Sequence, residues 1–427
     1  MGSGILLLTA IEMTDIRLKS AKAPGSMILN AIDVSSAALS ELHLYLRNQI
    51  RKIAEKKIVL LRGLYSGNKD LIENTEIIEY YIEDVISHIM LSTRTESSYQ
   101  STIIFEAIIE DSEIKIDLFR KILKNNNNDP WFFTNTSSVP ISELDRGAEL
   151  NGKIIGFHFY NPPAVQKLVE LIATDKTDIM LVEFARQLAG NLSKKIVPAN
   201  DFPGFIGNGH FIRDLLFGIS MAERLSEKFK LPASIYAVNR ISHDFLIRPM
   251  GIFQLMDYVG IDVCMKILQV MRSRLKDDQL HSNLIDKLIS AGIKGGQNPD
   301  VSQRPGIFIY EKGRPTSVFD CDLLKYLPLE SFRNDIDKKI GNPPPSWKPW
   351  KEVVNNRQNH VFLKHYFSEL KGSDTPGSKL AVEYHLNSKR IGLELVESGV
   401  ADNIGNVNTV LLTGFYHVYG PVNDYLD

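Results

Sequence analysis

The stretch IIGFHFYNPP at residues 154–163 contains a short apolar run that ends in a histidine and is followed by a proline turn. Similar apolar runs, each bounded by polar turns, occur at residues 103–109 and 131–134. Runs of this length with few polar positions are typical of parallel strands that are buried on both faces. An amphipathic segment, 112–124, lies between two of them. This strand–helix–strand order predicts an α/β sheet.

The strand pattern gives way to long helical patterns after Asp201, which predicts a second region built from helices. These patterns cover residues 211–229, 233–244 and 263–291. We expect four parts in chain order: an α/β domain over 1–199, a helical domain over 200–312, a proline-containing linker over 313–357 and a second helical domain over 358–427.

A short pattern recurs in the two helical parts. Gly251 is followed by Asp-Tyr at 257–258, and Gly420 is followed by Asp-Tyr at 424–425, each time after a helical stretch. The recurrence predicts that the two helical domains are related by duplication.

Composition excludes several classes of protein. The 427 residues are 44% hydrophobic and 23% charged, which is ordinary for a globular protein. Lys and Arg number 49 against 51 Asp and Glu, so no overall positive field attracts nucleic acid, and we expect no nucleic-acid partner. Two cysteines, Cys264 and Cys321, lack zinc-ligand spacing and predict a reducing compartment without a metal site. No apolar run is long enough for a membrane span, so we expect no membrane insertion and a cytoplasmic location.

His158 lies where an α/β sheet places its chemistry, at the end of the 154–159 strand, because strand carboxyl ends face the ligand crevice. Glu170 follows within the apolar run 168–172, where a buried carboxylate needs a partner. If Glu170 accepts a hydrogen bond from one ring nitrogen, the other nitrogen becomes a general base. The alternative is a structural histidine beside an unrelated buried ion pair, and the spacing alone leaves both open.

Two polar residues stand near other element ends. Ser137 follows the strand at 131–134, and its hydroxyl could contact a ligand or cap the helix that starts near Ile141. Asn208 stands at the entry to the helical region. A lone asparagine is weak evidence for a site.

Five motifs together resemble the 3-hydroxyacyl-CoA dehydrogenase family: TNTSS at 134–138, GFHFYNP at 156–162, LVELI at 168–172, PGFIGN at 203–208 and PMG at 249–251. They occur in this order and span nearly the whole chain. The resemblance implies a Rossmann-like α/β N-terminal domain followed by two related all-α domains, as in the dehydrogenase half of multifunctional fatty-acid oxidation enzymes. It also implies NAD-dependent oxidation of (S)-3-hydroxyacyl-CoA to 3-oxoacyl-CoA in β-oxidation, by a homodimer or with a partner subunit.

The resemblance also implies roles for single residues. His158 takes the proton from the 3-hydroxyl, and Glu170 orients and stabilises His158. Ser137 and Asn208 hold the substrate, while Ser137 and Asn161 lie beside the nicotinamide. Three further positions match more loosely: Glu110 and Lys115 approach the NAD ribose, and Tyr425 faces the substrate.

The NAD fingerprint is a strand, a Gly-x-Gly-x-x-Gly loop and an acid about 20 residues further on. Residues 1–5, MGSGI, resemble the tail of this loop, so we expect Gly2 and Gly4 to contact NAD and the first strand to be absent; a cloning remnant is the alternative. The usual spacing from Gly2 reaches Ser20, after a strand-like run at 14–19. Asp33 instead ends a strand-like run and precedes a helix, and we favour it as the acid for the ribose.

Two other functions compete with this one. The chain is alternatively a truncated, catalytically weak relative that binds acyl-CoA or a partner subunit, with His158 and Glu170 inherited but unused. A 3-hydroxyacid dehydrogenase that does not use CoA shares the NAD half but would lack the combination of HFYNP at 158–162 with PGFI at 203–206.

Overall fold

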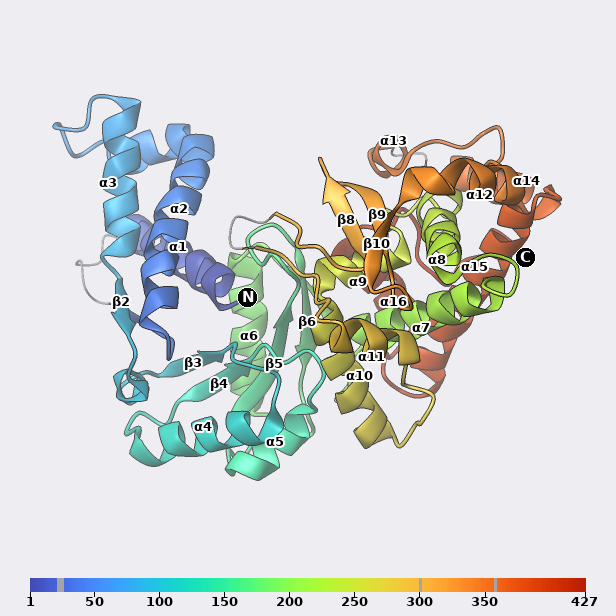
Figure 1. Cartoon of the computed structure of the whole chain (residues 1–427). Coiled ribbons are helices and arrows are strands. Elements are labelled where there is room, and N and C mark those ends of the chain that lie inside the picture. The colour runs from blue at the N-terminus through green and yellow to red at the C-terminus, as the bar shows by residue number, and fades with distance from the viewer. Residues whose placement is uncertain (21–26, 299–301, 357–358) are drawn as a thin grey trace. The chain divides into compact units, whose positions relative to one another are not determined.

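The computed structural model describes residues 1–20, 27–298, 302–356 and 359–427 (Figure 1). It divides into two compact units. Unit 1 contains residues 1–136 and 141–196, and unit 2 contains residues 137–140 and 197–427. Unit 2 is therefore discontinuous in sequence, because a tetrapeptide between two elements of unit 1 belongs to it.

A five-stranded sheet forms the centre of unit 1, in the order β3-β4-β5-β6-β7. The pairs β3–β4 and β4–β5 are parallel, whereas β5–β6 is antiparallel. Every residue of β5 and β6 is buried, as their apolar runs predict. The strands and the helices connected to them are β3 (Ile103–Glu106), α4 (Ser112–Asn125), β4 (Trp131–Thr134), α5 (Ile141–Ala148), β5 (Ile154–Phe159), β6 (Leu168–Ile172), α6 (Ile179–Asn191) and β7 (Lys195–Ala199).

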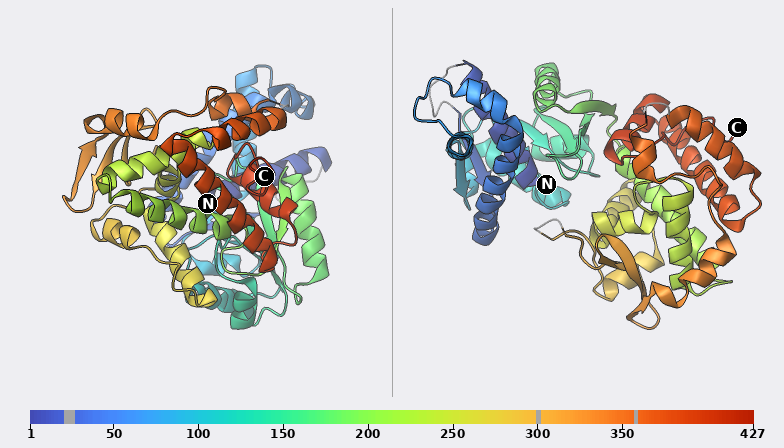
Figure 2. Two further views of the ribbon diagram at one scale, coloured as in Figure 1. Left: turned by 90° about the vertical axis from the view of Figure 1, so that its right-hand side faces the viewer. Right: turned by 90° about the horizontal axis from the view of Figure 1, so that it is seen from above.

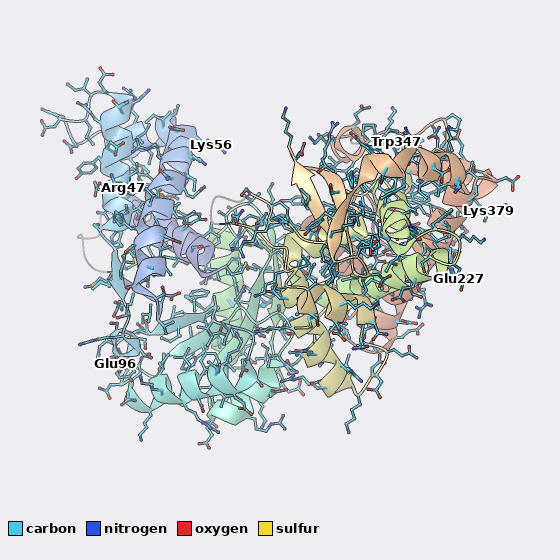
Figure 3. All side chains as sticks on the ribbon, viewed as in Figure 1. Arg47, Lys56, Glu96, Glu227, Trp347 and Lys379 are labelled. Atoms are coloured by element: carbon cyan, nitrogen blue, oxygen red, sulfur yellow. The ribbon has the colours of Figure 1, made fainter. Side chains whose placement is uncertain are left out.

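The first hundred residues of unit 1 contain a helical layer and a second, two-stranded parallel sheet. Helices α2 and α3 lie side by side (Figure 1; Figure 2). Arg47 of α2, labelled in Figure 3, forms ion pairs with Glu79 and Glu83 of α3. The elements are α1 (Gly2–Ser20), β1 (Leu29–Ile32), α2 (Ser36–Leu64), α3 (Asn74–Ile86), β2 (Ile89–Ser92) and the short 3₁₀ helix η1 (Thr95–Ser98).

The strand expected at residues 14–19 is wrong, because these residues continue helix α1. Leu7, Ala10, Ile11 and Thr14 are buried at helical spacing, so the apolar period of the whole segment overrides the local alternation. Asp15, in the same stretch, accepts hydrogen bonds from Lys57 of α2 and from Tyr81 of α3.

Unit 2 is mostly helical and includes one small antiparallel sheet, β10-β9-β8. Its elements are α7 (Gly207–Leu225), α8 (Leu231–Arg240), the π-helical turn η2 (Ile241–Phe245), α9 (Ile252–Val259), α10 (Ile261–Leu275), α11 (Asn283–Ser290), β8 (Phe308–Glu311), β9 (Arg314–Asp320), β10 (Lys325–Pro328), η3 (Leu329–Ser331), α12 (Arg333–Ile340), α13 (Trp350–Val354), α14 (Asn359–Gly372), α15 (Pro376–Glu397) and α16 (Ile404–Gly414). The helix expected over 263–291 is interrupted after Leu275, where Lys276 adopts a left-handed conformation with φ of 52°.

The prediction that residues 313–357 form a linker is wrong. This segment contains two strands, one short 3₁₀ helix and two α-helices, and the longest described stretch without regular elements is 341–349. Asp337 of α12 accepts hydrogen bonds from Tyr236 and Arg240 of α8, so the segment packs onto the unit. The predicted boundary at 357/358 lies outside the described residues.

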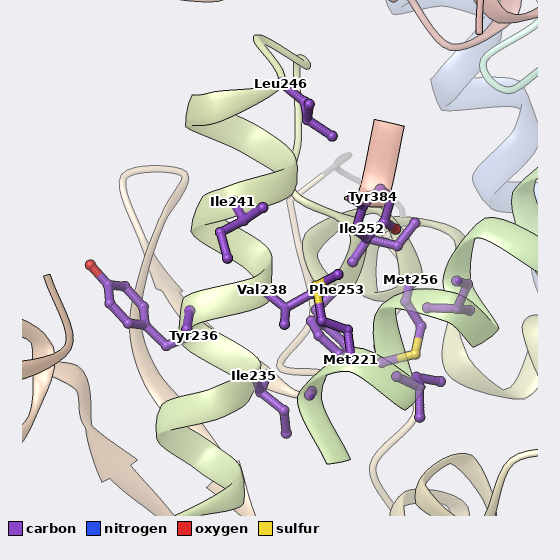
Figure 4. Close-up of a cluster of buried hydrophobic side chains, with 14 of the residues drawn as sticks. Met221, Ile235, Tyr236, Val238, Ile241, Leu246, Ile252, Phe253, Met256 and Tyr384 are labelled. Carbon is purple, nitrogen blue, oxygen red and sulfur yellow. The ribbon is translucent and has the colours of Figure 1, made fainter. Parts of the chain in front are cut away.

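Buried side chains from 211–319 and from 363–426 form a single hydrophobic cluster, part of which is shown in Figure 4. Tyr384 of α15 lies in this cluster with Met221 of α7 and Phe253 of α9. The two helical regions that we predicted as separate all-α domains thus share one core. Residues 420–425 also do not repeat the helix that residues 252–259 form.

A buried polar network lies within this core. Arg248 donates to the carboxylate of Asp214 over 2.7 Å and to Ser388 over 3.1 Å. Tyr384 donates to the backbone carbonyl of Asp214, and His210 contacts Ser388. The network ties α7 and α15 to the loop before α9.

Three buried histidines in unit 2, His210, His385 and His417, make stability depend on pH. Burial lowers the pKa of all three, that of His385 to about 4, and the positive charge of Arg248 lowers each further. The unfolded chain takes up protons below its ordinary histidine pKa of about 6.5, while the folded chain takes them up only at lower pH. The stabilisation is therefore complete above about pH 6.5 and declines as the pH falls, by about 1.4 kcal/mol per pH unit for each such histidine.

We expect the free energy of unfolding in urea to fall between pH 7.5 and pH 5.5, and to fall less in His385→Gln. His43→Gln, which changes an exposed histidine of α2, is the matched control and should keep the full decline. Identical declines in the three proteins would contradict the assignment to the buried histidines.

Candidate active site

His158 and Glu170 face each other across the antiparallel pair β5–β6, as directly opposed residues of the register. Opposed residues project from the same face of a sheet, so their side chains meet. The His158 Nδ1 atom lies 2.9 Å from Oε2 of Glu170, and the Glu170 side chain is fully buried. The contact that the sequence hypothesis requires is therefore present.

Tyr160 is a third member of this group that the sequence analysis missed. Its hydroxyl donates to the same oxygen, Oε2 of Glu170, over 2.9 Å. Loss of hydration and the Glu170 charge raise the pKa of the phenol well above its usual value, which keeps the hydroxyl protonated as a donor. The available signal was the two-residue spacing between His158 and Tyr160, which places both on one face of an extended chain.

Asn161 follows directly and begins the turn through a cis peptide bond to Pro162. The Lys194 ammonium donates to the backbone carbonyls of Pro163 and Gln166 over 2.5 and 2.6 Å and so holds this turn. Partial burial lowers the pKa of Lys194 to about 8. A Cβ atom at Gly4 would lie 2.8 Å from the Pro163 ring, so only glycine lets the first turn of α1 approach here.

The carboxyl end of β3 is built on a buried ion pair. The Lys115 ammonium lies 2.7 Å from Glu106 and 3.3 Å from Glu110. Thr134 at the end of β4 donates to the second oxygen of Glu106, and Thr136 donates to Glu110. The structure brings the predicted Glu110 and Lys115 together, but the sequence analysis gave no role to Glu106, the fully buried partner.

Asp33 lies at the carboxyl end of β1, exposed, and accepts a hydrogen bond from the Ser35 amide that begins α2. Ser20 instead ends helix α1. Asp33 therefore occupies the strand-end position at which a ribose-binding acid is expected. Helix α1 begins at Gly2, so its N-terminal amides and the Asp33 carboxylate are groups of the kind that bind dinucleotides.

Ser137 and Asn208 meet within unit 2. The side-chain amide of Asn208, in the first turn of α7, donates to the backbone carbonyl of Ser137 over 2.9 Å. Tyr425 contacts His360 through its hydroxyl at 3.0 Å.

No three His, Cys, Asp or Glu side chains within the described ranges are grouped so that they could hold a metal ion. Among the same residues, we find no helix that is both long and apolar enough to cross a membrane.

An α/β sheet with a buried histidine–glutamate pair on two interior strands, and an acid at the end of another parallel strand, is an arrangement expected of nucleotide-dependent dehydrogenases. Residues 26–202 match the family model described as 3-hydroxyacyl-CoA dehydrogenase, NAD binding domain, and residues 220–300 match the C-terminal domain of the same family. The chain belongs to the 3-hydroxyacyl-CoA dehydrogenase family and is an NAD-dependent oxidoreductase.

Curated relatives carry the same family name. A probable 3-hydroxybutyryl-CoA dehydrogenase of Deinococcus radiodurans is 31% identical over 50% of this chain and 75% of its own length. The mitochondrial hydroxyacyl-coenzyme A dehydrogenase of Homo sapiens is 29% identical over 63% of this chain and 81% of its own length. The solved structure of 3-hydroxybutyryl-CoA dehydrogenase from Escherichia coli K12 shares the fold, with a TM-score of 0.61 at 18% identity, over 99% of this chain and 88% of that one.

The buried position of Lys115 predicts a large effect on stability. Lys115→Met leaves the Glu106 carboxylate buried without its counter-charge, which should cost about 3–5 kcal/mol in urea unfolding. Lys121→Met is the control, because Lys121 pairs with Glu96 on the exposed surface and should cost less than about 1 kcal/mol. A loss of similar size in both variants would show that the burial of the Glu106–Lys115 pair does not increase its contribution to stability.

Proposed function

We propose that this chain oxidises (S)-3-hydroxyacyl-CoA to 3-oxoacyl-CoA in fatty-acid β-oxidation, with NAD as the acceptor. The observation that carries the proposal is the 2.9 Å contact between Nδ1 of His158 and the buried Glu170. The names of the Deinococcus and human relatives support an acyl-CoA substrate.

His158 acts as the general base in this proposal. Because Nδ1 donates its proton to Glu170, Nε2 carries the lone pair that accepts the proton of the substrate 3-hydroxyl. The Glu170 carboxylate fixes this tautomer and stabilises the imidazolium that forms. NAD, when bound, accepts the hydride that leaves carbon 3 of the substrate.

The remaining residues bind and orient. We assign Gly2, Gly4 and Asp33 to the NAD site, where the Asp33 carboxylate would accept hydrogen bonds from ribose hydroxyls. We also assign Glu110, Lys115 and Asn161 to the NAD site. The buried Lys115 holds Glu110, and Asn161 lies in the turn that Lys194 supports. Ser137 and Asn208 would hold the substrate, with Ser137 also beside the nicotinamide.

NADH binding and acetoacetyl-CoA reduction test the proposal on the full chain. We expect NADH fluorescence to report binding, and NADH oxidation to follow the addition of acetoacetyl-CoA. His158→Ala should lower kcat by about 10²–10⁴-fold because the proton-transfer group is lost, with NADH binding retained. His43→Ala, at an exposed position of α2, should leave kcat unchanged.

One result would overturn the proposed role of His158, and another would overturn the function. Turnover that survives in His158→Ala would remove His158 from the chemistry. Acyl-CoA binding without any NADH binding would instead support a catalytically weak relative that binds acyl-CoA.

A further inference from the structure

A single carboxylate oxygen in unit 1 receives two hydrogen bonds from the same stretch of chain. His158 Nδ1 and the Tyr160 hydroxyl both lie 2.9 Å from Oε2 of Glu170. The rings of His158 and Tyr160 also pack against each other, with centroids 5.1 Å apart. The two donors thus share the charge of one buried acid.

We propose that Tyr160 is a positioning residue that sets the basicity of His158 by drawing charge from Glu170. The inference rests on the proposed function only in that His158 is the base, and it concerns a residue to which that function gives no role.

The physical reason is competition for the charge on one oxygen. A hydrogen bond to a carboxylate stabilises its negative charge, and this reduces what remains to stabilise a proton on the neighbouring imidazole. With the phenol present, the Glu170 oxygen therefore holds the imidazolium less strongly. Removal of the hydroxyl concentrates the Glu170 charge on the Nδ1 proton, so the imidazolium becomes more stable.

Several other charged groups of unit 1 are engaged away from His158. Glu106 pairs with Lys115, Asp145 of α5 accepts from the Gly152 amide, and Lys194 donates to backbone carbonyls. Helix α6, which also packs on β5, buries apolar residues: Leu181, Ala185 and Ala189. Tyr160 and Glu170, by contrast, contact His158 directly.

The test is Tyr160→Phe, which removes the hydroxyl and keeps the ring. We expect the pH midpoint of the acid limb of kcat/KM for 3-hydroxyacyl-CoA oxidation to move up by about 0.5–1 pH unit, a three- to tenfold change in proton affinity. Oxidation at pH 6 should slow, while reduction of acetoacetyl-CoA at pH 8 should become faster, because it needs the protonated imidazole. A merely structural defect would slow both directions.

Tyr81→Phe is the matched control. Tyr81 also donates to a carboxylate over 2.9 Å, but to Asp15 in the helical layer, so its loss should leave the midpoint unchanged. In a Glu170→Gln background, which has no charge to share, adding Tyr160→Phe should no longer move the midpoint.

Imidazole ¹⁵N NMR separates this inference from the proposed function, because it follows the protonation of His158 in the protein without substrate. A raised midpoint in Tyr160→Phe would support the inference even if the enzyme did not turn over 3-hydroxyacyl-CoA. An unchanged midpoint in an active Tyr160→Phe enzyme would overturn it.

A measurement on the unsubstituted protein covers the case in which Tyr160→Phe does not fold. The ¹³Cζ signal of Tyr160 should titrate with the same midpoint as His158, since both donate to one oxygen. A Tyr160 signal that does not respond at that midpoint would overturn the inference.

Discussion

The buried carboxylate of Glu170 constrains the architecture of unit 1 more than any other group. A carboxylate in the interior is strongly unfavourable unless donors surround it. Both donors described for it come from residues 158–160, so they reach it only if β5 and β6 pair in the observed register. A slip by one residue would turn Glu170 to the opposite face. The antiparallel pair in an otherwise parallel part of the sheet is thus inseparable from the site.

Hydrogen bonds between neighbouring strand ends also occur along the carboxyl ends of the parallel strands. Thr134, the last residue of β4, donates to the buried Glu106 of β3, and the side chain of Asn135 accepts from the Phe159 amide at the end of β5. Side chains at one strand end thus bond to the neighbouring strand end, and these bonds hold the polar groups along this end of the sheet. Such cross-linking favours preorganised chemistry, since the donors are in place before a ligand arrives.

The sequence predicted this edge well because its signals are local. Apolar runs specify buried strands, and an acid within such a run requires a partner, so Glu170 became the candidate partner of His158, although spacing alone left the pairing open. The oxygen that Tyr160 shares could not be predicted, because it depends on the rotamer of a side chain beyond the strand. The strand prediction for residues 14–19 failed for a related reason. The alternation of polar and apolar residues is a local pattern, whereas the hydrogen-bond partners of Asp15, Lys57 and Tyr81, lie far along the chain. In unit 2, the prolines at 343–345 suggested a linker over a region whose packing on α8 depends on Asp337.

The tetrapeptide 137–140 has a consequence for how this protein can be divided. It belongs to unit 2, where the Ser137 carbonyl accepts from Asn208 and the Ser138 carbonyl accepts from the Gly204 amide. A gene fragment that starts at residue 197 would leave both donors without these acceptors, and a fragment that stops at 196 would carry the acceptors on the wrong piece. The two units are compact in space but interleaved in the reading frame, so recombination between homologous genes at residue 197 would separate groups that must be inherited together.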